Sequence, residues 1–430
     1  MKTLLLLCFI SLQAYATKIQ IIHTNDLHSY LKGYSPEQGG YYRVKTLIDK
    51  LKSEAQLKGI ESIVLDGGDF GEGSHYFLAD EGIHSFEALK RLGIDAAVIG
   101  NHDYMFGGKK LGEQIRAVNS KTQFLGANIA HTLDMKLTGL LKPTARFNVS
   151  GIQVEVIGLT TSSLHFSYAI SPGLIFPAAP VSRSHSKKAK EEGADLVVAL
   201  THLGLSKDKS LVKKDENLDI VIGGHSHTRL DKILWEKNIL GKNVPIVQTG
   251  AQGNAVGSLI LDVTKGAGYK VVSYKLHDAD TSVKPDKDLL EFVNEVDKKT
   301  KKALAGDRFD EVIGYSDYDL SGYGNSGHVD HQEGCWTSVL GDIVREGNGA
   351  DIGLYLSSFA GKLIPAGPIT YGNIIENFPH IQAFGQPGWE VMTFRIDGWK
   401  LYSLLTAMIN LDKGFLTSKY YLPLEPFLLG

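Results

Sequence analysis

Residues 98–107 read VIGNHDYMFG, and this stretch decides the fold class. An apolar, strand-like run ends at Ile99, and soon after it Asn101, His102 and Asp103 stand side by side. Polar side chains seldom follow a buried strand so closely unless those groups have a function, because burying a polar group without a partner is unfavourable. The stretch therefore predicts a buried strand whose carboxyl end carries chemistry.

Four other short apolar runs end in the same way. They are 19–23 before TNDLH, 63–65 before DGGD, 196–200 before THLG, and 220–222 before GGHSH. Helix-like patterns at 41–53, 84–92 and 182–192 lie between the runs, so an α/β fold with buried strands is expected. One such motif is typical of an ordinary turn or polar loop. Five of them at the carboxyl ends of strands favour a shared site, because ligands bind at that edge of open α/β sheets.

The residue types at these strand ends fit a metal site. Carboxylate, imidazole and amide oxygen together suit Zn²⁺, Mn²⁺ or Fe²⁺, and the absence of thiolates argues against a structural zinc site. Seven or more candidate ligands are too many for one open catalytic ion, so two ions roughly 3.5–4 Å apart with a shared carboxylate are expected. With Asp26 and Asp69 as the anionic ligands, a local charge of about +2 would attract a phosphate dianion and lower the pKa of a bridging water towards hydroxide.

Five motifs carry a resemblance to a known family. They are HTNDLH (23–28), LDGGDF (65–70), GNHDY (100–104), THLG (201–204) and GGHSHT (223–228). The chain resembles the calcineurin-like metallophosphoesterases over about residues 18–265, and most of all their exported branch of 5′-nucleotidases, UDP-sugar hydrolases and 2′,3′-cyclic phosphodiesterases. The resemblance implies a four-layer sandwich of two mixed sheets flanked by helices, with a smaller C-terminal α/β domain.

The resemblance also implies two sets of metal ligands that share Asp69. The first ion would be held by Asp26, His28, Asp69 and His227, and the second by Asp69, Asn101, His202 and His225. His102 would be the catalytic histidine that donates a hydrogen bond to the phosphoryl group as negative charge builds up. Its position directly after Asn101 also places it near the second ion. His23, by contrast, precedes its loop and is expected to pack as a structural residue.

The opening stretch departs from the family at one residue. The family pattern is Gly-Asn-His-Glu-Phe-Asp, in which the last Asp orients the catalytic histidine, but Met105 stands at that place here. A thioether cannot hold an imidazolium as a carboxylate does. We therefore expect either a less basic His102 or another orienting group. Asp103 is the nearest candidate and is taken as a second catalytic residue. Because adjacent side chains often point apart, a structural role is the alternative.

The C-terminal region departs further. Residues 364–379, IPAGPITYGNIIENFP, resemble the C-terminal motif of the family, but the nucleotide-binding loop that normally precedes it is replaced by LSSFAGK at 356–362, and Trp336 stands where an arginine is usual. The chain also stops earlier than the family does, so this domain is either incomplete or reduced. Plain core or loop packing is the alternative to substrate binding. The candidate substrate-binding residues are Phe359, Lys362, Phe378 and His380.

The first residues predict export. Lys2 precedes an apolar run, and Ala14-Tyr15-Ala16 forms an A-x-A cleavage site, so residues 1–16 are expected to be a secretory signal peptide that directs the protein to the periplasm or the medium. Once residues 1–16 are removed, Cys335 is the only cysteine and no intramolecular disulfide can form. No other apolar run is long enough to span a membrane.

The expected organisation is a metallophosphoesterase domain at 17–283, a linker helix at 284–305 and a substrate domain at 306–430. A net charge of −3 is too balanced to suggest a nucleic-acid polymer as partner. The sequence thus predicts an exported phosphoester hydrolase acting on nucleotides or related small phosphoesters, and leaves its oligomeric state open. The alternatives are a thiosulfohydrolase-like enzyme for a non-nucleotide anion, and a non-catalytic binding protein of the same fold.

Overall fold

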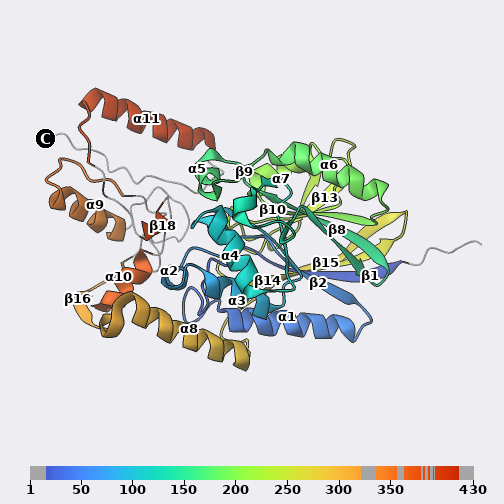
Figure 1. Cartoon of the computed structure of the whole chain (residues 1–430), viewed down its shortest axis with the longest axis horizontal. Coiled ribbons are helices and arrows are strands. Elements are labelled where there is room, and N and C mark those ends of the chain that lie inside the picture. The colour runs from blue at the N-terminus through green and yellow to red at the C-terminus, as the bar shows by residue number, and fades with distance from the viewer. Residues whose placement is uncertain are drawn as a thin grey trace, which may run out of the picture.

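The computed structural model describes residues 16–320, 335–355, 363–378, 381–382, 386–387, 391 and 393–415. Two mixed sheets form its centre (Figure 1). The seven-stranded sheet has the order β15 (Gly268–Asp278), β14 (Ala255–Thr264), β1 (Thr17–Thr24), β2 (Glu61–Asp66), β3 (Ala96–Val98), β4 (Gln123–Leu125), β6 (Leu141–Lys142). The six-stranded sheet has the order β12 (Leu234–Lys237), β13 (Asn243–Val247), β11 (Ile220–Ile222), β10 (Leu196–His202), β8 (Ile152–Thr160), β7 (Thr144–Val149).

Each sheet has a parallel centre and antiparallel strands at its edges. Strands β1, β2, β3, β4 and β6 run parallel, β14 pairs antiparallel with β1, and β15 pairs antiparallel with β14. In the other sheet β8, β10, β11 and β13 run parallel, and β7 and β12 are antiparallel. The parallel centres place the carboxyl ends of β1, β2 and β3, and those of β10 and β11, at the edge of their sheet where ligands are expected to bind.

The alternation of side chains shows how the two sheets pack. Successive residues of a strand point to opposite faces, and here Ile63 and Leu65 of β2 lie in one buried cluster with Val198 and Leu200 of β10. The residue between the first two, Val64, belongs to a different cluster on the outer face. The two inner faces therefore bury one shared apolar layer.

Helices cover both outer faces. On the first sheet they are α1 (Tyr41–Gln56), α3 (Ile83–Leu92), α4 (Gly108–Val118) and α8 (Lys287–Ala305). On the second sheet they are α6 (Ala178–Glu191) and α7 (Leu205–Val212). The expected four-layer sandwich of two mixed sheets flanked by helices is confirmed (Figure 1).

Helix α8 lies where the sequence predicts a linker helix. Asp286 caps it, since its side chain accepts a hydrogen bond of 2.8 Å from the backbone N–H of Leu289. The apolar stripe Leu289, Val293 and Val296 is buried in the core beneath the first sheet. In the sequence, Leu289, Leu290, Val293 and Val296 form a narrow apolar stripe on a charged helix, and the helix packs along the sandwich through this stripe.

Residues 245–263, PIVQTGAQGNAVGSLILDV, predict antiparallel strands joined by a Gly-rich turn. The structure differs from this prediction, because β13 and β14 belong to different sheets. The segment crosses from one sheet to the other, and Asn25 holds it there. Asn25 donates to the carbonyl of Gly250 at 2.7 Å and accepts from the N–H of Thr249 at 2.8 Å.

Short elements connect these layers. They are α2 (His75–Ala79), η1 (Asn101–Tyr104), β5 (Ile129–Ala130), η2 (Leu133–Met135), α5 (Leu164–Ser167), η3 (Tyr168–Ile170), β9 (Leu174–Ile175) and η4 (Gly306–Arg308). The C-terminal elements are β16 (Val312–Ser316), α9 (Cys335–Gly347), β17 (Gly367–Thr370), α10 (Tyr371–Asn377), β18 (Ile381–Gln382), β19 (Gln386–Pro387) and α11 (Gly398–Phe415). Helices α9, α10 and α11 gather at one end of the sandwich, orange to red in Figure 1.

A small core of its own supports this C-terminal part. It contains Leu320, Trp336, Leu340 and Ile364. Trp336 Nε1 donates to the buried side chain of Asn377, which agrees with a packing role for this tryptophan. Within the described part of the chain, no helix is both long and apolar enough to cross a bilayer.

His23 is buried as a neutral group in the first sheet. It is fully buried, its ring stacks on Tyr274 with centroids 6.0 Å apart, and neither ring nitrogen hydrogen-bonds to a described residue. Burial lowers the pKa of His23 to about 3. The unfolded chain, in which a histidine has a pKa of about 6.5, therefore binds a proton that the folded protein excludes.

We expect this histidine to make folding sensitive to acid. Below about pH 6.5 the unfolded state gains the proton, so the free energy of unfolding falls as the pH drops towards 3, by up to about 1.4 kcal/mol per pH unit from this group. His23→Leu should remove that part of the slope. Urea unfolding at pH 8 and at intervals down to pH 4 measures it. An unchanged slope in the variant would mean that His23 titrates normally in the folded protein.

Candidate metal centre

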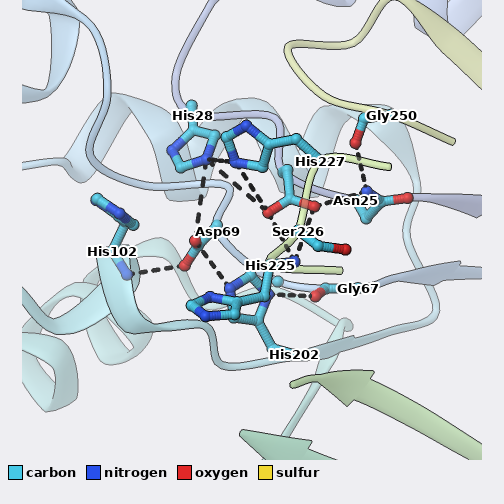
Figure 2. Close-up of polar contacts among 12 residues, drawn as sticks. Asn25, His28, Gly67, Asp69, His102, His202, His225, Ser226, His227 and Gly250 are labelled. Carbon is cyan, nitrogen blue, oxygen red and sulfur yellow. Dashed lines mark hydrogen bonds and ion pairs between the residues drawn. The ribbon is translucent and has the colours of Figure 1, made fainter. Parts of the chain in front are cut away.

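Asp26, His28 and His227 form the first cluster of candidate ligands. Figure 2 shows the rings of His28 and His227 side by side. Asp26 and His28 come from the loop after β1, and His227 comes from the loop after β11 in the other sheet. One ligand atom from each lies within 4.8 Å of the others. His28 Nε2 is 2.9 Å from His227 Nε2, and His227 Nε2 is 3.4 Å from Asp26 Oδ1.

Asp69, His202 and His225 form the second cluster. His202 Nε2 lies 2.8 Å from Asp69 Oδ2, and the same oxygen lies 3.9 Å from His28 Nε2 of the first cluster. Asp69 Oδ1 accepts a hydrogen bond of 2.8 Å from the backbone N–H of His102. The Asp69 carboxylate therefore stands between the two clusters, which is the position of a bridging ligand.

Backbone carbonyls orient two of the imidazoles. His28 Nδ1 lies 2.6 Å from the carbonyl oxygen of Glu72, and His202 Nδ1 lies 2.7 Å from that of Gly67. A carbonyl can only accept, so each Nδ1 carries the proton and each ring turns its Nε2 towards the cluster. Metal-binding histidines are commonly held in this way.

Asn101 is a buried amide without a partner in the described structure. It begins η1, is 1% exposed, and neither its Nδ2 nor its Oδ1 forms a hydrogen bond with a described residue. Buried polar side chains are seldom left unsatisfied. Because its neighbour His102 donates to Asp69, Asn101 lies beside the second cluster, and an ion there would satisfy its oxygen.

Strained backbone marks the same residues. A positive φ is uncommon for a residue other than glycine and costs roughly 1–3 kcal/mol. Five of the candidate ligands adopt it: Asp26 (52°), His28 (51°), Asp69 (56°), His225 (75°) and His227 (51°). The loops are thus held in conformations that their side chains do not favour, as is common at functional sites.

The pKa values of the two carboxylates are shifted in opposite directions. Burial raises the pKa of Asp26 to about 7, against the opposing effect of His202. Burial also disfavours the ionised form of Asp69, but His202 and His102 outweigh it and hold the pKa of Asp69 well below its usual value. A bound cation would favour the ionised form of both groups.

The pKa values of the candidate histidine ligands are also shifted in opposite directions. Burial lowers the pKa of His28 to about 4 and that of His225 to about 3, so both are neutral and present a lone pair. Burial opposes protonation of His202 too, but Asp69 raises its pKa to about 10. The proton on His202 Nε2 thus stands beside Asp69 where a cation would bind, and a metal ion would displace it.

This donor set fits divalent metal ions. Lone pairs of imidazole nitrogen, carboxylate oxygen and an unsatisfied amide converge from both sheets, which is the chemistry preferred by Zn²⁺, Mn²⁺ or Fe²⁺. The structure brings all seven predicted ligands to the same edge of the sandwich. They are Asp26, His28, Asp69, Asn101, His202, His225 and His227.

His102 lies at the border of the site and contacts an acid that the sequence analysis missed. Its side chain is 22% exposed, and its Nδ1 contacts the carboxylate of Glu72, which is 1% exposed. Burial opposes the imidazolium, but Glu72 and Asp69 raise the pKa of His102 to about 9. His102 is thus more basic than an ordinary histidine, and not less. Of the two expectations, the contact with Glu72 agrees with the second, another orienting group.

Asp103 holds backbone through its carboxylate, which agrees with the structural role left open for it. Its carboxylate accepts hydrogen bonds from the backbone N–H groups of Asp69 (3.0 Å), Gly71 (2.8 Å) and Gly100 (2.7 Å). It therefore ties the loop after β2 to the turn after β3, and Glu72 takes the position beside His102. The physical reason is the 3-10 turn of η1, which directs Asp103 back onto the N–H of Gly100.

The predicted substrate-binding residues are mostly not placed. Phe359, Lys362 and His380 lie outside the described residues. Phe378 is half-buried, packs against the small C-terminal core, and makes an edge contact with Tyr355 at 6.3 Å between ring centroids.

Comparison with known proteins agrees with this geometry. Residues 19–229 match the family model described as calcineurin-like phosphoesterase. These residues form a calcineurin-like phosphoesterase domain, and all seven candidate ligands lie within it.

Two relatives show which phosphoesterases this chain is similar to. The trifunctional nucleotide phosphoesterase protein YfkN of Bacillus subtilis (strain 168) is 25% identical over 405 residues, which cover 84% of this chain and 26% of that protein. A 5′-nucleotidase of Diplobatis ommata is 29% identical over 286 residues, covering 61% of this chain and 49% of that protein. The chain thus spans at most about half the length of these relatives.

A solved structure supports the fold. The crystal structure of a 5′-nucleotidase precursor from Thermus thermophilus superposes with a TM-score of 0.71 at 24% identity, covering 84% of this chain and 74% of that one. It shares the sandwich and the smaller C-terminal domain, and at this identity the likeness concerns the fold alone.

We expect the protein to bind about two divalent ions per chain, and Asp69→Asn to reduce this to one or fewer. The substitution removes the charge and one acceptor oxygen between the clusters. The measurement is metal content by mass spectrometry after loading with Mn²⁺ or Zn²⁺ and desalting.

Asp208→Asn is a matched control. Asp208 is buried in α7, accepts from the Thr201 hydroxyl at 2.7 Å and belongs to neither cluster. Burial raises its pKa to about 7, so an amide resembles its protonated form. The control should retain both ions. Retention of both ions by Asp69→Asn would contradict the bridging position.

Proposed function

We propose that this protein is a metal-dependent phosphoester hydrolase of the 5′-nucleotidase type, acting on nucleotides or related small phosphoesters. The observation that supports it most is the position of Asp69 between two clusters of candidate ligands, with His102 at their border. The names of the relatives, a nucleotide phosphoesterase and a 5′-nucleotidase, point to the same substrate class.

Two ions are proposed to bind at these clusters. Asp26, His28, Asp69 and His227 would hold the first, and Asp69, Asn101, His202 and His225 the second. Bound there, Zn²⁺, Mn²⁺ or Fe²⁺ would neutralise the phosphoryl oxygens and make a water molecule more acidic.

The protein's own groups would position the substrate and stabilise charge. Phosphoryl transfer requires mainly positioning and charge neutralisation. In the metal-free protein, Glu72 and Asp69 raise the pKa of His102 to about 9 against the effect of burial, which favours the protonated form. In that form His102 would donate a hydrogen bond to a phosphoryl oxygen as negative charge develops on it. Asp103 would hold the loop of Asp69 against the turn of His102, because its carboxylate accepts from the backbone N–H groups of Asp69 and Gly100.

Export and domain roles are part of the proposal. The pattern of residues 1–16 supports secretion or transfer to the periplasm. We assign catalysis to residues 17–283, linkage to 284–305 and substrate contacts to 306–430, where Phe359, Lys362, Phe378 and His380 remain the candidates.

A substrate panel tests the proposal. Purified protein with Mn²⁺ or Zn²⁺ should hydrolyse bis-para-nitrophenyl phosphate and a nucleoside monophosphate or nucleotide sugar, and a chelator should abolish this. We expect His102→Ala to lower kcat by roughly 10²–10⁴-fold, the usual contribution of a positioned proton donor. The readout is release of phosphate or nitrophenol.

The same panel separates the alternatives. Hydrolysis of a thiosulfate conjugate without any phosphoester would indicate the thiosulfohydrolase type. Bound metal without hydrolysis of any member would indicate a binding protein. Either outcome would contradict the proposed activity.

A further inference from the structure

Glu72 contacts two histidines of the candidate site. It lies in the loop after β2 and is 1% exposed. Its N–H donates to the carbonyl of His102 at 3.2 Å, and its own carbonyl accepts from His28 Nδ1 at 2.6 Å. Its carboxylate contacts His102 Nδ1. One residue thus reaches a candidate ligand through its backbone and the proposed catalytic histidine through its side chain.

Two glycines fix where this carboxylate stands. A Cβ on Gly71 would lie 2.9 Å from the carbonyl oxygen of His102, and a Cβ on Gly73 would lie 2.6 Å from Cβ of His28. Gly73 also has a φ of 148°, which other residues rarely adopt. The Gly-Glu-Gly segment is therefore wedged between His28 and the turn that carries His102, so the main chain sets the direction of Glu72.

The contact determines the proton arrangement of His102. An ionised carboxylate only accepts hydrogen bonds, so Nδ1 of His102 must be the donor. This leaves Nε2 as the ring nitrogen that can exchange a proton with substrate, and a carboxylate partner holds both the tautomer and the ring orientation. The carboxylate is buried while the imidazole is 22% exposed. Glu72 can therefore hold the ring from the protein side, and the ring remains accessible to substrate.

No other acid takes this role in the opening stretch. Met105 stands where the family pattern has the orienting Asp, and a thioether cannot replace a carboxylate here. Asp103 uses both its oxygens on backbone N–H groups.

We propose that Glu72 is the positioning residue of His102, and that it replaces, from the loop after β2, the carboxylate expected at position 105. The orienting acid would thus come from a different loop than in the family pattern, while the histidine occupies the same position. The proposal rests on the proposed function insofar as His102 acts on substrate.

Glu72→Gln tests it, because glutamine keeps the size and loses the charge. We expect kcat to fall by roughly 10²-fold, at the lower end of general acid–base effects, with KM and metal content unchanged. Glu81→Gln is a matched control in the next loop, where Glu81 pairs with Lys110 at the surface, and it should behave as the parent.

Two double variants separate positioning from general damage. If Glu72 acts through His102, adding Glu72→Gln to His102→Ala should cause no further loss. Adding Met105→Asp to Glu72→Gln should restore part of kcat, because it returns a carboxylate to the position expected from the family. Parent-like kcat in Glu72→Gln, fully additive losses, or loss of metal in place of kcat would each overturn the proposal.

A spectroscopic measurement keeps the proposal separate from the activity. In the metal-free protein labelled with ¹⁵N at histidine, His102 should show a protected, downfield Nδ1–H resonance, assigned by its absence in His102→Ala. Glu72→Gln should shift it upfield or abolish it. Its absence from the folded parent would overturn the proposal even if Glu72→Gln fails to fold. Its presence without any phosphoester hydrolysis would contradict only the proposed function.

Discussion

The carboxylate of Asp69 is the contact on which the site depends. It follows β2 of the seven-stranded sheet, yet one oxygen lies 2.8 Å from His202 at the end of β10 in the other sheet, and the second accepts from the N–H of His102 after β3. The shared apolar layer brings the two sheets together, and the strand ends are left facing one another at a single edge. Burial then makes these charges depend on each other, since little water is present to screen them.

Much of this arrangement could be predicted from the sequence, because the buried strands and helix α8 each show a recognisable apolar pattern. Runs such as 63–65 and 196–200 are apolar on both faces, as strands between layers must be, and each ends in a polar motif. Parallel strands place such ends at one edge, so convergence of Asp69 and His202 follows without knowledge of the loops. The stripe Leu289, Val293 and Val296 likewise predicts how α8 packs.

The parts that could not be predicted depend on the direction of side chains within loops. Asp103 looks like the partner of His102 because it is adjacent, but the tight turn of η1 directs its oxygens onto backbone N–H groups. Glu72 looks like part of a flexible Gly-rich turn, and only the close approach of its glycine neighbours to His28 and His102 reveals its place. The crossing at Gly250 could not be predicted either, since two strands joined by a short turn need not belong to the same sheet.

The left-handed backbone at five candidate ligands has a consequence for how this protein would evolve. At each position glycine, and at several asparagine, would hold the same main-chain shape at lower cost. A chain selected only for a stable fold would drift towards those residues and lose its imidazoles and carboxylates at Asp26, His28, Asp69, His225 and His227. Stability and ligand supply therefore pull these loops in opposite directions, which is the trade-off expected where a protein keeps strain for the sake of activity.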